Sequence, residues 1–412
     1  MSPISQKFAL YSSPHEMEPL LPSEHVVGPL LEQAHDLMAE AQRLNGFCHT
    51  AARLELRGLL RAMNSYYSNK IEGQHTLPAE IEDALKSDFA QDADKARRQH
   101  LAVAHIHTEE WLESAPLMAD TAPWANCFES EVICNIHGHL FSQLPVNDDT
   151  SHVNRDLSSD LTIEPGVLRT QGVSVGRHAA PAHEAVVPML VRWAQVYGGA
   201  RRGEMQVLAA AASHQRLAWI HPFLDGNGRV ARLHTHALFR HMGLTTGLWS
   251  PLRGFARSQE RYYATLAAAD EPRAGDLDGR GNLTERGLLA WISYVLEVSL
   301  DQVRFMSGLL QLSGMQDRMA ACLAFEENVI KQGVRSEALR PLHYLFSTQG
   351  ELERVDFKLM TGLGERQASG LVSALLKRGL VKTDTPYGKL RFAVPLHALR
   401  FYFPALWPEA QV

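Results

Sequence analysis

HPFLDGNGRVAR, residues 221–232, places a histidine and a proline before an acidic residue, two glycines around an asparagine, and two arginines one helical turn apart. Pro222 disfavours the α conformation for His221, so the histidine is expected at a helix end or in a loop that faces a cleft. Gly226 and Gly228 can adopt a positive φ and let another group approach the backbone closely. The stretch therefore predicts a tight loop that leads into a helix, with His221 beside it.

The polar groups of this loop suit a phosphate-containing ligand. Free backbone N–H groups at a helix start attract anions, and Arg229 and Arg232 share one face of the following helix. Asp225 offers an oxygen ligand for the magnesium ion that accompanies a polyphosphate, and His221 suits the acceptance of a proton from a nucleophile. A Gly-Asn-Gly segment alone is more typical of a helix end and a turn. The full combination predicts a site for nucleotide phosphates and one proton transfer.

Composition and charge are those of an ordinary globular protein. The chain has 412 residues, of which 45% are hydrophobic and 21% charged, and a formal net charge of -6. This balance argues against a protein whose main function is to coat nucleic acid. No apolar run is long enough to span a bilayer, and the opening MSPISQKFALYSS lacks the regions of a signal peptide, so a cytoplasmic protein without membrane contact is predicted. The four cysteines lack CxxC spacing, which favours free thiols.

The apolar spacing is helical along most of the chain. The clearest helical patterns cover residues 29–44, 51–63, 129–144 and 288–306. A short β-hairpin is expected within 166–178, where glycines interrupt β-compatible residues, and the turn-rich stretch 270–285 predicts a long loop.

The pattern changes at about residue 330. Three short helices are expected first, and two strands then flank the turn Pro386-Tyr387-Gly388. The segments concerned are 335–347, 355–363, 366–379 and 381–394. That order favours a winged helix at the C-terminal end.

HPFLDGNGRVAR resembles the complete signature of the Fic family, HPFxDGNGRxxR, without a departure. The resemblance implies an all-helical core with a small β-hairpin flap, and transfer of AMP from ATP to a hydroxyl side chain of a target protein. It implies that His221 is the general base and Asp225 the magnesium ligand. It further implies that the ATP contacts of the loop and the following helix come from Gly226, Asn227, Gly228, Arg229, Val230, Ala231 and Arg232.

The resemblance extends over approximately residues 5 to 300. QGVSVGRHAAP (171–181) is similar to the flap that docks a target segment by strand addition. Its part that faces the nucleotide would consist of Val175, Gly176, Arg177 and His178. RYYATLAAAD (261–270) is similar to the region that encloses the adenine, with Tyr262 and Tyr263 matching, and the DGRGNLTERG loop (278–287) is also typical of the family.

SNKIEG (68–73) resembles the inhibitory motif of the same family. Ser68 and Glu72 are at i and i+4, which predicts one helix that carries both, and Gly73 would end that helix. Spacing alone is also compatible with a solvated surface glutamate, the commoner situation of this residue type. The resemblance implies instead that Glu72 pairs with Arg232, takes the place of the γ-phosphate and forces ATP into an unreactive pose.

Clustered histidines offer an alternative metal site. They are His137, His139, His234, His236 and His241. Residues at i and i+2 point to different sides of a helix and no HExxH motif occurs, so packing or surface roles are predicted. Trp193, Trp219 and Tyr197 occupy apolar helical positions and are expected in the core.

The predicted fold class is all-α, a Fic-fold helical core with a small β-hairpin flap, plus a C-terminal winged-helix-like α+β domain. We expect four regions. They are an N-terminal helical region with the inhibitory helix (1–110), a Fic catalytic domain (111–300), a connecting helix (301–330) and a winged-helix-like domain (331–412).

The predicted function is that of a protein adenylyltransferase with magnesium and ATP, held in check by Glu72 and able to modify itself. A homodimer is expected by analogy with the family. One alternative is the same fold transferring UMP or a phosphoryl group, because the motif binds phosphates without reading the base. A second alternative is a DNA-binding regulator that reads DNA through helix 364–378 and the wing residues Lys382, Lys389 and Arg391. Winged helices also bind proteins, so residues 331–412 are expected to contact DNA or a protein.

Overall fold

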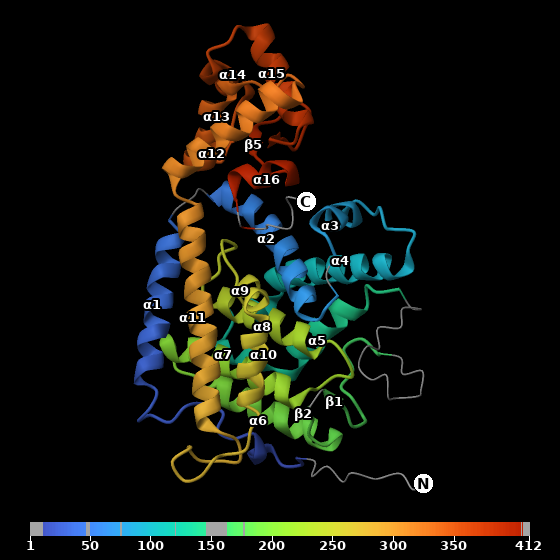
Figure 1. The fold of residues 1–412 in the computed structure, drawn as a ribbon, viewed down its shortest axis with the longest axis vertical. Helices are drawn as coiled ribbons and strands as arrows, with labels where there is room; N and C mark the ends of the chain where they lie inside the picture. Colours follow the sequence, from blue (N-terminus) through green and yellow to red (C-terminus); the bar gives the residue numbers. More distant parts are fainter. Residues whose placement is uncertain are drawn as a thin grey trace.

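A computed structural model of the chain describes residues 11–46, 50–74, 76–119, 121–145, 163–175, 178–404 and 406. Helices dominate these residues, and the strands are confined to a small hairpin and a small sheet (Figure 1). The predicted fold class is therefore confirmed. Among the described residues, no helix is both long and apolar enough to cross a membrane.

The helical core is built around α7 (Glu204–Ile220) and α8 (Asn227–His241). α7 is buried on every side, and its alanines 209–212 allow close approach of α1 (Gly28–Leu44), α6 (Val186–Gly198) and α11 (Glu285–Leu309). A helix that is buried on all sides lies at the centre of a bundle. α1 and α11 run side by side along one edge of the molecule (Figure 1).

The remaining helices of the core close its other faces. α2 (Thr50–Ile71) packs against α4 (Ala93–Ser114), and α4 in turn contacts α5 (Ser130–Phe141). The shorter elements are α3 (Pro78–Leu85), α9 (Leu252–Arg257), α10 (Gln259–Ala268) and the 3-10 turns Pro14–Met17, Pro116–Met118, Trp124–Phe128 and His183–Ala185. α4 begins with a side-chain cap: Asp92 accepts a 2.8 Å bond from the backbone N–H of Lys95.

The predicted hairpin is present as β1 (Ser174–Val175) and β2 (His178–Ala179), which pair antiparallel with Ser174 opposite Ala179. The predicted long loop after α10 is also present. It is closed by a single bridge between Pro272 and Leu283, and Leu283 donates its N–H to the carbonyl of Glu18 at 2.9 Å. The loop is thereby tied to the N-terminal part of the described chain.

The C-terminal part forms a separate cluster at one end of the molecule (Figure 1). It contains α12 (Leu312–Phe325), the π turns Glu326–Ile330 and Leu345–Gln349, the 3-10 turn Ser336–Ala338, α13 (Leu339–Tyr344), β3 (Glu351–Leu352), α14 (Arg354–Thr361), α15 (Glu365–Lys377), β4 (Val381–Lys382), β5 (Leu390–Phe392) and α16 (Leu396–Tyr402). The strands form an antiparallel sheet in the order β3-β5-β4. The two predicted strands are present in a winged-helix-like order, and β3 was not predicted because two residues show no periodicity.

The packing of α12 bears on the predicted boundaries. α12 contacts α16 and α13, so it is part of the C-terminal cluster rather than a free connector. The cluster rests on α2 through β5, and Lys382 reaches Glu55 of α2 at 2.5 Å. The expected boundaries at 110 and 300 fall inside α4 and α11, and the division into four domains stays a prediction.

Candidate functional site

His221 stands at the point where α7 ends. It caps the helix in the left-handed conformation, with φ 51° and ψ 61°, which is uncommon for a residue with a side chain. Its Nδ1 lies 3.4 Å from the carbonyl oxygen of Ala218. Burial lowers the pKa of His221 to about 3, and the nearby His178 and Arg169 act in the same direction. The imidazole is therefore neutral at physiological pH and has a free lone pair to accept a proton.

The loop between His221 and α8 is held by its own side chains. Asn227 accepts a bond from the N–H of Phe223 and donates one to its carbonyl, both at 2.9 Å. Gly226 has φ 78°, and a Cβ there would lie 2.3 Å from the ring of Phe141. Only glycine fits this position, so the sequence fixes the loop conformation and leaves the start of α8 open to a ligand. The two hydrogen bonds of the Asn227 side chain hold the loop in this conformation.

Arg229 is a buried cation with spare hydrogen-bonding capacity. Its side chain is 3% exposed and its guanidinium lies over the ring of Phe141, with Nη2 3.3 Å from Asp225 Oδ2. Nε and Nη1 are buried and make no hydrogen bond with the part of the chain that the structure describes. A buried donor without a partner is costly, and a bound anion would remove that cost.

Arg232 is engaged by the end of α2. Its Nη2 donates to Glu72 Oε1 at 2.6 Å, while Nε and Nη2 donate to the hydroxyl and the carbonyl of Ser68, both at 3.0 Å. The expected contact between Glu72 and Arg232 is thus present. α2 ends at Ile71, so Glu72 lies one residue beyond the helix rather than in its last turn, and Gly73 adopts the positive φ of a helix end.

The carboxylate of Glu72 lies directly on the loop of residues 225–228 at the start of α8, which we call the anion loop. A Cβ at Gly228 would be 2.5 Å from Glu72 Oε1, so the carboxylate touches the backbone where α8 begins. Burial acts to raise the pKa of Glu72, but Arg232 and Arg229 outweigh it and hold the pKa below its usual value. Glu72 is therefore an ionised group in the place where the loop would hold an anion.

A cavity of about 630 Å³ joins these groups to α10 and the flap. It is lined by His221, Gly228, Arg232 and Glu72 at one end and by Leu266, Ala267, Asp270, Glu271 and Pro272 at the other. Tyr262 is 2% exposed and shares a 3.0 Å bond with His214, and the hydroxyl of Tyr263 donates to the carbonyl of Ile71 at 2.8 Å. Both tyrosines line the cavity, which has the size of a ligand site.

Four predicted ATP contacts, Gly226, Arg229, Val230 and Ala231, do not line this cavity, and neither does Asp225, the predicted magnesium ligand. The side chains of Val230 and Ala231 are buried in the core, at 1% and 0% exposure, and do not line the cavity. Gly176 and Arg177 of the flap lie outside the described residues, as does the side chain of Val175.

His178 holds β2, the second strand of the flap, at the cavity. Its Nε2 bonds the carbonyl of Trp219 at 2.8 Å, which leaves Nδ1 facing Asp270 at 3.5 Å. Burial raises the pKa of Asp270 to about 7, with Glu271 acting in the same direction. The carboxyl group of Asp270 is therefore partly protonated near neutral pH.

Residues 127–239 match the family model described as the Fic/DOC family. This part of the chain is a Fic domain. Two relatives are similar to this chain. "Protein adenylyltransferase fic-1" of Caenorhabditis briggsae is 28% identical over 145 residues, which cover 35% of this chain and 27% of that protein. "Protein adenylyltransferase Fic" of Drosophila ananassae is 32% identical over 110 residues, which cover 26% and 21%. The chain thus spans about a quarter of the length of these relatives.

Solved structures of Fic proteins are also similar to this chain. A Fic family protein from Desulfovibrio desulfuricans G20 aligns with a TM-score of 0.48 and 17% identity, over 93% of this chain and 99% of that chain. Residues 134–508 of Fic-1 from C. elegans align with a TM-score of 0.49 and 19% identity, over 70% and 74%.

The Fic domain supplies His221, Asp225, Arg229 and Arg232, but not the whole site. Glu72 comes from α2, and Tyr262 and Tyr263 come from α10, both outside the matched residues. The contact that occupies the anion loop is therefore made between the Fic domain and a segment that precedes it in sequence.

Arg169 is a residue of the Fic domain that sequence reasoning missed. It is 3% exposed, and its side chain donates to the carbonyls of His221 at 2.7 Å and Ile220 at 3.3 Å on one side. On the other side it donates to the carbonyls of Gln171 at 2.9 Å and Pro181 at 2.7 Å, the two ends of the flap segment. One guanidinium thus connects both ends of the flap segment to the backbone of His221.

Tyr11 is a second missed residue, and it lies outside the Fic domain. It lines the cavity and its ring is 4.9 Å from that of Trp219, at an angle of 50°. No periodic pattern marks the segment around Tyr11, so its place at the cavity required the structure.

The clustered histidines pack in the core of the Fic domain or at its edges. His137 stacks on Phe223 at 4.0 Å, His139 stacks on Trp111 at 3.9 Å, and His234 bonds the carbonyl of Cys127 at 2.8 Å. No group of three or more metal-ligating side chains occurs among the described residues. Trp193, Trp219 and Tyr197 are buried in the core as expected.

Proposed function

We propose that this protein is a protein adenylyltransferase, which transfers AMP from ATP to a serine, threonine or tyrosine hydroxyl of a target protein. The observation that carries the proposal is the placement of a neutral His221 beside an anion loop, with Arg229 and Arg232 behind that loop. The names of the two relatives support the same reaction. The neutral histidine provides the base and the arginines provide the phosphate contacts.

The proposed reaction uses His221 as the general base. The target hydroxyl oxygen attacks the α-phosphorus of ATP, the bond from that phosphorus to the bridging oxygen breaks, and pyrophosphate leaves. The hydroxyl proton passes to Nε2 of His221, because Nδ1 faces the Ala218 carbonyl. Arg229 and Arg232 balance the charge that builds up on the leaving phosphates.

Asp225 is proposed to hold the magnesium ion that arrives with ATP. Its carboxylate lies at the loop beside Arg229, and no other carboxylate or histidine of the described residues completes a metal cluster with it. A single carboxylate fits magnesium, which takes its remaining ligands from phosphates and water. The ion would neutralise phosphate charge when bound.

Glu72 is proposed to restrain the reaction. Its carboxylate sits on Gly228 and Arg232, where the triphosphate would otherwise settle. A nucleotide bound beside it would leave the α-phosphorus misaligned with the attacking hydroxyl, and misalignment of this kind is costly for the rate. The flap segment 171–181 is proposed as the docking strand for the target.

Ion pairs in the wing, residues 381–392, weaken the alternative of a DNA-binding regulator. Lys382 pairs with Glu55, Lys389 with Glu351, and Arg391 with Asp384. Paired cations attract phosphates less than free ones, and α15 also presents Glu365 beside Arg366 on its exposed face. The C-terminal cluster is therefore better suited to an accessory contact.

Labelling separates AMP transfer from its alternatives. The full chain is incubated with a protein extract, beside the extract without the chain, and with ATP labelled on the α- or on the γ-phosphate; unlabelled ATP, CTP, GTP and UTP serve as competitors. We expect protein-bound label from the α-phosphate only, and strong competition from ATP alone. Label from the γ-phosphate that depends on the chain would show phosphoryl transfer, and protein-bound label from UTP labelled on the α-phosphate would show transfer of UMP.

A further inference from the structure

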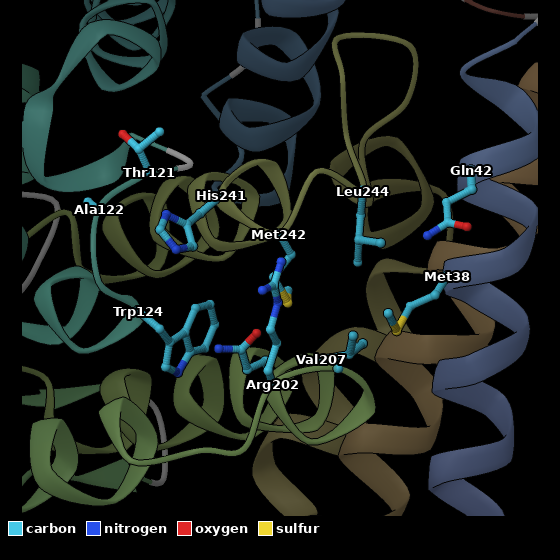
Figure 2. Close-up of a pocket in the computed structure, with 12 residues that line it drawn as sticks. Met38, Gln42, Thr121, Ala122, Trp124, Arg202, Val207, His241, Met242 and Leu244 are labelled. Atoms are coloured by element: carbon cyan, nitrogen blue, oxygen red, sulfur yellow. The ribbon is translucent and has the colours of Figure 1, made fainter.

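A second cavity of about 470 Å³ lies at the far ends of α7 and α8 (Figure 2). α7 begins there, after Gly203, and α8 ends there, at His241. Their opposite ends carry His221 and the anion loop, and the 17 residues of α7 span roughly 25 Å. The two cavities share no lining residue, so this one is distinct from the proposed nucleotide site.

The polar groups of this second cavity are positive or neutral. Figure 2 shows the side chain of Arg202 pointing into its centre. Arg202 forms no ion pair with the described residues, and the buried Nδ1 of His241 makes no hydrogen bond with them. No aspartate or glutamate is among the described residues that line the cavity. A positive group in a cavity that no carboxylate lines favours an anionic ligand.

The walls around Arg202 are mixed, because Gln42, Thr121 and Gln206 line the cavity together with an apolar part formed by Trp124, Met38 and Met242. Trp124 donates its Nε1–H to the carbonyl of Tyr197 at 2.8 Å, so it offers its ring rather than a donor. Met38 and Met242 face each other across the cavity from α1 and the end of α8 (Figure 2). Thioethers and aromatic rings adapt to flat or irregular apolar groups.

We propose that this cavity binds a small organic anion, in which a carboxylate or phosphate group contacts Arg202 and an aromatic or short aliphatic body lies against Trp124 and the two methionines. The volume of about 470 Å³ is within the usual range for small-molecule sites. The site is independent of the proposed adenylyl transfer, because none of its lining residues belongs to the nucleotide cavity.

The proposal is tested by NMR on the full chain with carbon-13 methionine methyl groups. Phenyl phosphate and phenylacetate are titrated separately and without ATP, because ATP is itself a phosphate with an aromatic body, and Met38 and Met242 line this cavity and not the nucleotide cavity. The signals of Met38 and Met242, assigned with Met38→Leu and Met242→Leu, are expected to shift with a Kd below ~1 mM for at least one of the two anions. The anion that shifts them tells whether the site takes a carboxylate or a phosphate.

Matched controls make the test specific. Benzyl alcohol, which lacks the charge, should leave the two signals unshifted. Arg202→Gln should weaken binding by about tenfold, as expected for the loss of a charged contact. Arg201 is exposed as Arg202 is, but it does not line the cavity, so Arg201→Gln should bind as wild type does. The proposal is overturned if neither anion shifts the signals up to ~10 mM, if benzyl alcohol shifts them equally, or if Arg202→Gln binds like wild type.

Discussion

Replacing Glu72 by glycine is expected to raise self-labelling by the full chain. The change removes the 2.6 Å bond between Glu72 Oε1 and Arg232 Nη2, together with the carboxylate that touches Gly228. A hydrogen bond between charged groups contributes about 1.5–3 kcal/mol, and ATP must displace this bond before its phosphates reach Arg232. Since a factor of ten in rate corresponds to about 1.4 kcal/mol, the variant should label itself at least about tenfold faster.

The assay is the initial rate of incorporation from ATP labelled on the α-phosphate, with calorimetric ATP binding measured in parallel. Glu72→Asp keeps a carboxylate near Arg232 and is expected to remain close to wild type. Glu72→Gly combined with Arg232→Ala should lose the gain, because the arginine that the first change releases is then absent. A folded Glu72→Gly variant that labels itself no faster than wild type would refute the restraint and leave Glu72 as a surface residue.

Four further predictions follow from the same geometry. His221→Ala should reduce labelling by about 10²- to 10⁴-fold and leave the Kd for ATP nearly unchanged; undiminished labelling would remove His221 from the role of base. Arg169→Gln should lower kcat for labelling by at least about tenfold with a smaller change in the KM for ATP, because a misplaced His221 harms the reaction more than binding. Arg169→Lys should recover part of the loss in kcat. Equal losses in both variants, in kcat and KM alike, would indicate a general folding defect. A chain that ends at residue 310, before α12, should stay folded and label itself but choose different partners, whereas loss of all chemistry with ATP binding intact would make the C-terminal cluster part of the catalytic unit. Stability should fall as pH drops from about 6.5 towards 4, because the unfolded chain takes up protons at His105, His137 and His214 whereas burial lowers their pKa to about 3 in the folded protein. Each such histidine contributes about 1.4 kcal/mol of destabilisation at pH 5.5, and His221, His234 and His236, whose pKa values burial lowers to about 3 or about 4, add to the fall. Glu109 and Asp270, whose pKa values burial raises to about 8 and about 7, oppose it by about 2 kcal/mol each between pH 7 and pH 5, which is less than the six histidines contribute together; a melting temperature that stays constant between pH 7 and pH 5 would contradict this.

Local patterns predicted most of the core and the centre of the site. The helix expected at 29–44 is present as α1, Gly28–Leu44, because its apolar spacing is itself the packing surface against α11. The loop from His221 to Gly228 could also be predicted from the sequence, because Pro222, Gly226 and Asn227 act on the backbone immediately around them. Such short-range effects can be predicted from the sequence alone.

Contacts between distant segments could not be predicted in the same way. Arg169 bonds backbone carbonyls of Ile220 and His221, and a carbonyl carries no sequence signal. Tyr11 meets Trp219 only because the N-terminal segment folds across the cavity. The end of α2 at Ile71 shows the limit of spacing arguments: the i, i+4 relation placed Glu72 on the right side of α2, but whether the last residue is helical depended on the turn at Gly73.

The measurement that tests the central claim most directly is the intact mass of the Glu72→Gly variant after incubation with ATP and magnesium, beside the variant that also carries His221→Ala. Adenylyl transfer with His221 as the base predicts that the first protein gains the mass of one or more AMP groups and that the second gains none. A gain equal to a phosphoryl group, or the same AMP adduct on both proteins, would contradict that account.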